Sequence, residues 1–221
     1  MKKLSFIMIL TATMLMVGCA SLNKTQKGAI IGTAGGGAAG AVIGKVAGNT
    51  ALGAIIGAAV GGATGAIIGH QMDKQAAEIA KTVPDANVVR VGEGIVVEFS
   101  SNVLFGFDQT NITSDARTNL DKLVKVLDTY PDTNIEIQGH TDSKGSLAYN
   151  KTLSQQRAAA VSNYLISQNV SAYRLSNVGF GETLPKYQND TESGRSQNRR
   201  VEFLITANEK MKAEAAKEAV K

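Results

Sequence analysis

Asp142 and Arg157 are the residues whose types and spacing are best suited to ligand binding. Asp142 follows a short predicted strand in which Ile135 and Ile137 alternate with polar neighbours. Arg157 lies about two turns into the helix that the spacing of residues 159–168 predicts. The loop between them can fold so that both side chains face one cleft. A carboxylate and a guanidinium that stay close without neutralising each other suit a ligand carrying both an ammonium and a carboxylate.

These residues lie in or near three short sequence motifs, which occur one after another along the chain. They read GHTD at residues 139–142, NKTLSQQRA at 150–158 and NRRV at 198–201. Together they resemble the carboxy-terminal peptidoglycan-binding domain of the OmpA family, over slightly more than half of the chain. The resemblance predicts a domain over residues 87–206 with an α+β fold of βαβαβ order, in which helices cover one face of a mixed sheet.

The resemblance implies that the ligand is the meso-diaminopimelate of the peptidoglycan stem peptide. Asp142 then pairs with its ammonium. Arg157 binds its carboxylate through two parallel hydrogen bonds, which a lysine cannot make. The further positions matched to the binding cleft are all polar: Asn150, Arg199, Arg200, Asp108 and Thr110.

Each of these residues also has a purely structural interpretation. Asp142 and Arg157 could form a salt bridge that ties the loop to the helix. Asn150 could be the N-cap of that helix, and it could serve both roles. The two arginines could lie on the solvent face of a strand, and Asp108 could form a turn.

Catalysis finds little support in the sequence. His70 and His140 are the two histidines, and neither has a second histidine or a cysteine nearby to build a metal site or a nucleophile pair. His140, Asp142 and Ser154 can be arranged as a triad on paper, but no nucleophile elbow or oxyanion loop accompanies them. We therefore expect a non-enzymatic protein with no cofactor and no metal.

The chain begins with the features of a lipoprotein export signal. Lys2 and Lys3 precede an apolar stretch over residues 4–17, and MVGC at 16–19 resembles a lipobox with Met in place of the usual Leu. Residues 1–18 are then a signal peptide, and Cys19, the one cysteine of the chain, heads a lipidated N-terminus over residues 19–27. The alternative is an ordinary signal peptide with an incidental cysteine. Ala20 implies sorting to the outer membrane of a Gram-negative bacterium, with the binding domain in the periplasm.

Residues 28–70 repeat glycine every fourth position, with one interruption at Asn49 and Thr50. This spacing puts the glycines on one stripe of a helix. In water each interior glycine costs a helix about 1 kcal/mol relative to alanine, whereas in a bilayer such stripes let helices pack closely. We expect a glycine-zipper helical hairpin with arms near the ~20 residues that span a bilayer. A flexible linker and a soluble oligomer of hairpins are the alternatives.

The segments on either side of the predicted domain are polar. Residues 71–86 predict a linker or stalk with a short helix, whose apolar face is Met72, Ala76, Ile79 and Val83. Residues 207–221 are rich in Ala, Glu and Lys, which predicts a solvated helical tail. The formal charge is +4, and removal of a leader that contains Lys2 and Lys3 leaves +2, which is too small and too dispersed to indicate nucleic-acid binding.

Within the domain, alternating apolar residues predict strands at 88–91, 95–99, 135–139, 174–178 and 200–205. A helix with Ser114 as its N-cap is expected to end before Pro131, and a short helix is expected before Asn198.

With its leader and glycine ladder, the whole chain most resembles the YiaD-type outer-membrane lipoproteins. The function this implies is a lipid-anchored protein that binds peptidoglycan and tethers the envelope to the wall. The alternative is a glycine-zipper oligomer, or a pore-like membrane assembly, that wall binding merely positions. Expected partners are peptidoglycan, the membrane and further copies of the chain, and not nucleic acid.

Overall fold

The computed structural model describes residues 60–106 and 109–221. The predicted leader, Cys19, residues 19–27 and most of the glycine ladder therefore lie outside the described residues, as does Asp108. What the sequence predicts for those segments stays a prediction.

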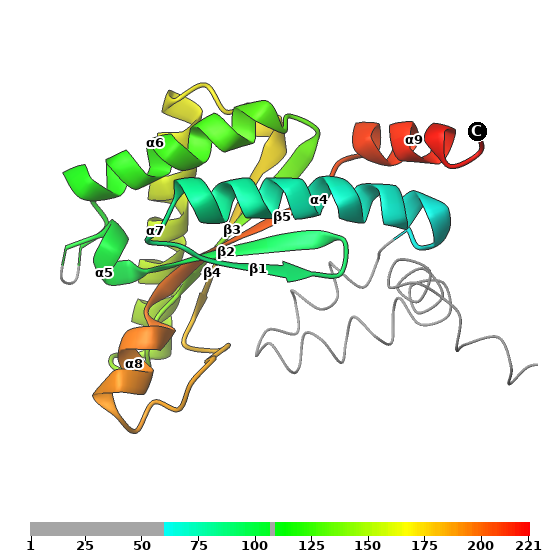
Figure 1. The fold of residues 1–221 in the computed structure, drawn as a ribbon. Helices are drawn as coiled ribbons and strands as arrows, with labels where there is room; N and C mark the ends of the chain where they lie inside the picture. The colour runs from blue at the N-terminus through cyan, green and yellow to red at the C-terminus, as the bar shows by residue number, and fades with distance from the viewer. Residues whose placement is uncertain (1–59, 107–108) are drawn as a thin grey trace, which may run out of the picture.

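A five-stranded mixed sheet with the order β1-β2-β5-β3-β4 forms the centre of the molecule (Figure 1). Strands β3 and β4 are parallel, and all other neighbours are antiparallel. Every strand overlaps the position that the sequence predicts. The strands are β1 (Asn87–Val91), β2 (Gly94–Ser100), β3 (Thr133–His140), β4 (Leu175–Gly181) and β5 (Arg200–Ala207).

Helices pack on one face of this sheet and enclose the main core. Alternate strand residues, including Val97, Phe99 and Phe203, belong to the same buried cluster as apolar residues of α4, α6 and α7. The rings of Phe99 and Phe203 meet edge to face with centroids 5.6 Å apart. The predicted α+β fold is thereby confirmed. The helices are α4 (Gly62–Thr82), α5 (Ser101–Leu104), α6 (Ser114–Thr129), α7 (Leu147–Ser167), α8 (Glu192–Asn198) and α9 (Glu209–Glu218), with a 3-10 turn, η1 (Ala172–Arg174).

Two of the predicted helix caps are wrong. Thr113, and not Ser114, caps α6, because its hydroxyl accepts a hydrogen bond from the Ala116 N–H. Helix α7 begins earlier than Asn150 and is capped by Ser146, whose hydroxyl accepts from the Tyr149 N–H. Asn150 therefore lies inside α7 and is left for another role.

Helix α7 approaches β3 and β4 more closely than side chains on those strands would allow. An ideal Cβ at Gly139 would lie 2.1 Å from the Ser154 carbonyl oxygen, and one at Gly179 would lie 2.2 Å from the Gln155 nitrogen. The Ser154 hydroxyl accepts from the Gly181 N–H at 2.8 Å across the same contact. The glycine of the GHTD block is thus a packing requirement, which fixes α7 relative to the end of β3.

Helix α4 runs through the boundary that the sequence predicts between residues 70 and 71. Its buried side chains include Ile68, Met72, Ala76 and Ile79, which agrees with the apolar face expected there. They pack in the same cluster as the sheet. Residues 71–83 are therefore part of the folded core and not a free-standing linker or stalk.

The β1–β2 hairpin holds the start of α4 through one carboxylate. Glu93, at the hairpin turn, accepts hydrogen bonds from the N–H groups of Val60 and Gly61, both at 3.1 Å. An ideal Cβ at Gly65 would lie 2.3 Å from Glu93 Oε1, so this ladder glycine makes room for the carboxylate. Gly61 adopts a φ of 67°, a conformation that other residues rarely take.

The docked residues 62–69 belong to the second arm of the predicted glycine hairpin. Because Ile68 is fully buried in the core of the domain, these residues cannot lie in a bilayer while they are docked. Among the residues that the structure describes, no helix is both long enough and apolar enough to cross a membrane.

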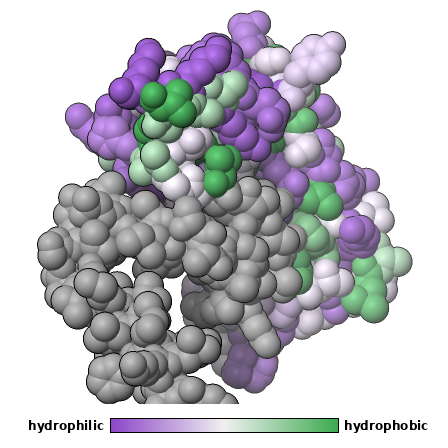
Figure 2. Space-filling model, turned by 90° about the vertical axis from the view of Figure 1, so that its right-hand side faces the viewer, coloured by the Kyte–Doolittle hydropathy of each residue, from purple (hydrophilic) through white to green (hydrophobic). Residues whose placement is uncertain are grey.

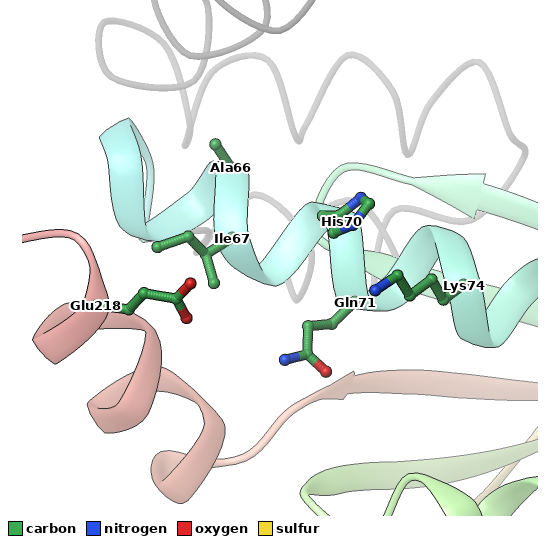
Figure 3. A pocket seen from close by; sticks show the side chains of 6 residues that line it. All are labelled: Ala66, Ile67, His70, Gln71, Lys74 and Glu218. Atoms are coloured by element: carbon green, nitrogen blue, oxygen red, sulfur yellow. The ribbon is translucent and has the colours of Figure 1, made fainter.

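The predicted solvated tail is only partly solvated. Helix α9 packs beside the first half of α4, and Met211 and Ala215 are buried there. Figure 3 shows Ile67 of α4 and Glu218 of α9 in an open groove between the two helices. On this side of the molecule, where grey atoms do not cover it, hydrophobic residues form separate small areas among hydrophilic ones (Figure 2).

Gly179→Ala is expected to destabilise the fold by about 1–3 kcal/mol, because the new methyl group would overlap the backbone of α7. The matched control is Gly69→Ala, whose methyl group would meet its nearest atom, Arg90 Nη2, at an ordinary 3.8 Å. As an interior helix substitution it should stabilise by up to about 1 kcal/mol. Urea unfolding measures both. Equal effects of the two substitutions would contradict the close packing of α7.

Candidate ligand-binding site

The three sequence blocks meet at one end of the sheet. Strands β3 and β5 are antiparallel neighbours, and Gly139 lies opposite Val201. The end of β3 that carries GHTD is therefore beside the start of β5 that carries NRRV. Helix α7, which carries the middle block, packs against β3 and β4 at the same place.

Asp142 is buried and rigidly held at this end of β3. Its side chain is only 8% exposed. Its Oδ1 atom accepts a hydrogen bond from the Lys144 N–H at 2.9 Å, and its carbonyl accepts from the Thr141 hydroxyl at 2.9 Å. The carboxylate is thus fixed in position by its own loop.

The ionic partner of Asp142 is Arg199. Asp142 Oδ2 lies 2.5 Å from Arg199 Nη1. The salt bridge that Asp142 makes is therefore not the one with Arg157 that the structural interpretation of this pair described. The sequence named both Asp142 and Arg199, but it gave no sign that they would pair.

Arg157 lies on the side of the loop that follows α5. Its Nε donates to the Gln109 carbonyl at 3.1 Å, and its guanidinium carbon lies 5.4 Å from the centre of the Phe105 ring. It is 5% exposed. Thr110, in the same loop, is partly exposed, and Asp108 lies outside the described residues. The structure thus associates Arg157 with the loop that the sequence assigned to the border of the cleft.

Asn150 links the Asp142 loop to the end of β4. Its Nδ2 donates to the Asp142 carbonyl at 3.2 Å and to the Glu182 carboxylate. Since Asn150 is buried, it orders the loop from within. Glu182 was not identified from the sequence, because only the fold brings it beside α7.

The residues of the NRRV block separate into two roles. Asn198 is fully buried, and its amide binds the loop at Tyr187 through that residue's N–H and carbonyl. Arg200 is also buried and pairs with Glu202 at 2.6 Å. Only Arg199, whose side chain is 25% exposed, extends toward Asp142. Of the paired arginines, Arg199 therefore lies at the site, while Arg200 belongs to the interior.

Glu192 is a residue of the site that sequence reasoning missed. Its Oε1 lies 2.9 Å from Arg199 Nη2, and its Oε2 lies 2.9 Å from Arg195 Nη2. Lys144 Nζ is 3.5 Å from the same Oε2. Hydrogen bonds from Arg199 and then Arg195 lower the pKa of the Glu192 carboxyl to about 2. Arg195 and Arg199 lie only three and seven positions away in sequence, but the contact with Lys144, 48 positions away, exists only in the folded chain.

His140 lies under the site on the second face of the sheet. It is 1% exposed, its ring stacks on Phe180 with centroids 5.4 Å apart, and neither ring nitrogen has a hydrogen-bond partner among the described residues. Burial, then the positive charges of Arg200 and Lys186, lower the pKa of His140 well below 6.5. It is therefore neutral near pH 7 and does not contact Ser154 as a triad would require.

Comparison with known proteins supports two regions of similarity. The OmpA family model matches residues 104–199, and the model of the YMGG-like Gly-zipper matches residues 1–73. The probable lipoprotein YiaD of Escherichia coli K12 is 34% identical over 139 residues, which are 62% of this chain and 64% of that protein. The peptidoglycan-associated lipoprotein of Brucella melitensis is 34% identical over 113 residues, which are 51% of this chain and 67% of that protein.

A solved structure described as the cell wall anchor of the T6SS from Pseudomonas aeruginosa is similar to this fold. The TM-score is 0.55 at 26% identity, and the match covers 62% of this chain and 97% of that one. The chain spans 16%, 34% and 64% of the length of the first three curated relatives that it matches. The similarity is therefore that of a shared domain and not of whole proteins.

The buried neutral His140 predicts a stability that falls on acidification. Below pH ~6.5 the unfolded chain binds a proton on this histidine while the folded chain does not, so the free energy of unfolding falls as the pH decreases. The slope contributed by His140 is up to about 1.4 kcal/mol per pH unit. Urea unfolding between pH 7.5 and 5.5 measures it.

His140→Phe should remove this slope, whereas His70→Gln, at an exposed position of α4, should keep it. An unchanged slope in His140→Phe would show that other groups cause the pH dependence.

Proposed function

The chain belongs to the OmpA family, and from this membership we propose that it binds peptidoglycan non-covalently and attaches the cell envelope to the wall. Relatives named peptidoglycan-associated lipoproteins, and a similar structure described as a cell wall anchor, support the proposal. Other relatives are named porins and outer membrane proteins. The protein acts by binding and is not an enzyme.

The observation that carries this proposal is the ion pair between Asp142 and Arg199. Asp142 is buried and held by its loop, while Arg199 is partly exposed at the rim. A zwitterionic ligand can replace this one salt bridge with two, its ammonium on Asp142 and its carboxylate on a guanidinium. The ligand supplies one positive and one negative charge, so Asp142 and the guanidinium both keep an ionic partner. A buried charge left without a partner would cost several kcal/mol.

We propose that the zwitterion is the meso-diaminopimelate of the stem peptide. Asp142 takes its ammonium, and Arg157 and Arg199 bind its carboxylate with two parallel hydrogen bonds available from each guanidinium. Asn150 keeps the Asp142 loop in position. Thr110, in the loop beside Arg157, and Asp108 are expected to contact the ligand from that side. Arg200 supports the site indirectly, because its buried ion pair with Glu202 fixes the start of β5, where Arg199 is attached.

The anchoring half of the proposal rests on the amino-terminal sequence. Acylation of Cys19 after removal of residues 1–18 places several acyl chains in the outer membrane, each contributing about 0.8 kcal/mol per buried methylene. Relatives named as lipoproteins support the proposal that Cys19 is acylated. The binding domain then lies in the periplasm, within reach of the wall.

The glycine zipper favours a second candidate function. The YMGG-like Gly-zipper match over residues 1–73 covers the ladder, whose close glycine spacing suits helix-to-helix packing. In this candidate the ladder assembles several copies of the chain into a membrane-associated oligomer, and wall binding positions the assembly.

Asp142→Asn and Arg157→Gln are each expected to weaken binding to diaminopimelate-type peptidoglycan by about 30-fold or more, because each leaves a ligand charge without its partner. Co-sedimentation of the full chain in detergent with purified sacculi measures this. Matched controls are Asp128→Asn and Arg117→Gln, at exposed positions of α6. Circular dichroism checks that every variant is folded. Unchanged pelleting of both site variants would refute the site.

Replacing alternate ladder glycines with leucine tests the second candidate. If Gly32, Gly40 and Gly57 lie at helix-to-helix contacts, their substitution should abolish cross-linkable oligomers and leave co-sedimentation with sacculi intact, because bulky side chains separate the helices. Leucine at Ala38, Ala54 and Ala58, also in the ladder segment, is the control for added hydrophobicity. Normal cross-linking of the glycine variant would rule out the oligomer.

A further inference from the structure

The Asp142–Arg199 pair continues outward into a second group of charges, around Glu192. We propose that Lys144, Arg195 and Arg199 form a second anion subsite, and that Glu192 occupies it as an internal substitute for a ligand carboxylate. The subsite takes a carboxylate of the stem peptide other than the one beside the diaminopimelate ammonium. This inference rests on the proposed function and specifies which peptides the site prefers.

Three cations converge on the single carboxylate of Glu192. Its two oxygens lie 2.9 Å from Arg199 Nη2, 2.9 Å from Arg195 Nη2 and 3.5 Å from Lys144 Nζ. With Asp142 on the other side of Arg199, the cluster holds three positive charges and two negative ones. The cluster therefore keeps a surplus positive charge that a further anion can match.

Two of the three cations, Arg195 and Arg199, have contacts besides those with Glu192. Arg195 Nη1 donates to the carbonyls of Asn189 at 2.7 Å and Asp190 at 3.1 Å. The Lys144 backbone N–H is fixed on Asp142, and Arg199 stands between two buried neighbours in the chain. Arg195 and Arg199 are thus expected to keep their positions when the Glu192 carboxylate moves away, and the exposed Lys144 ammonium can follow the incoming anion.

Glu192 is suited to being displaced. Its side chain is 59% exposed, so its carboxylate can move into water without a large loss of hydration. Its contacts are ion pairs near the surface, which are individually weak. An incoming carboxylate exchanges these contacts for equivalent ones, so the net cost of displacement is small.

Arg199 connects the two subsites. One of its terminal nitrogens binds Asp142 and the other binds Glu192. When a ligand ammonium replaces Arg199 at Asp142, the guanidinium remains among the other cations and is available to ligand carboxylates. A stem peptide suits this arrangement because, beyond its ammonium-bearing head group, it carries further carboxylates a few bonds away.

A pair of peptides tests the subsite. The first is a synthetic tripeptide of alanine, glutamate and meso-diaminopimelate with free carboxylates. The second is the same peptide with every carboxylate amidated except the one beside the free ammonium. Isothermal titration calorimetry with the full chain in detergent gives the ratio of the two dissociation constants.

Wild-type protein should bind the free acid about threefold more tightly than the amide, since ion pairs at an exposed rim are modest. Glu192→Gln should raise this preference to about tenfold, because the competing internal carboxylate is gone. Lys144→Gln should bring the preference close to one. The control Lys217→Gln changes the charge equally on α9, at the other end of the molecule from α8, and should behave as wild type.

Equal affinity for both peptides in wild type and Glu192→Gln would overturn the subsite and leave the proposed function standing. Loss of binding to both peptides in Glu192→Gln, with wild-type binding intact, would also overturn it and make Glu192 a structural clamp for α8. Lys144→Gln remains decisive if Glu192→Gln fails to fold, because in the described part of the chain the Lys144 ammonium bonds only to Glu192. Failure of the wild type to bind either peptide would instead refute the proposed function.

Discussion

The antiparallel pairing of β5 with β3 is the constraint on which the site depends. The last strand, β5, lies between β2 and β3, so the sheet is complete only after the rest of the domain has been added to the chain. This placement of β5 brings Arg199 within 2.5 Å of Asp142, across 57 positions of sequence. The close approach of α7 at Gly139 and Gly179 then fixes Asn150 and Arg157 relative to the same pair. The candidate site, made of separated sequence blocks, is thus held together by the sheet and by α7.

Much of this fold could be predicted from local patterns. Alternating apolar residues located all five strands, and the face of α4 that packs into the core was evident from Met72, Ala76 and Ile79. The block resemblance named Asp142, Arg157 and Arg199 as candidate binding residues, and the structure brings Asp142 and Arg199 into contact. Their pairing was not predictable, because a local pattern carries no information about which arginine a carboxylate meets after folding.

Apart from the two helix caps, the failures of prediction share one physical cause, which is long-range packing. A polar, charged segment such as residues 71–86 resembles a linker, yet its few apolar side chains suffice to join the core. The tail was expected in solvent for the same reason, although Met211 and Ala215 pack near α4. Glu192 was missed because its contact with Lys144, 48 positions away, forms only in the folded chain. The burial of Arg200 was equally hidden, because Arg199 beside it is the same residue type and only the fold separates their roles.

The hydrogen bonds that Glu93 accepts at the beginning of α4 determine where a pulling force enters the domain. Any pull on the chain before residue 60 enters the molecule through the hairpin turn and along the helix axis, at the end remote from α8 (Figure 1). Tension is thereby received by the edge hairpin, while the strands that hold Asp142 and Arg199 lie deeper in the sheet. If the domain binds the wall as proposed, tension in the envelope would reach the edge hairpin before it reaches the Asp142–Arg199 pair.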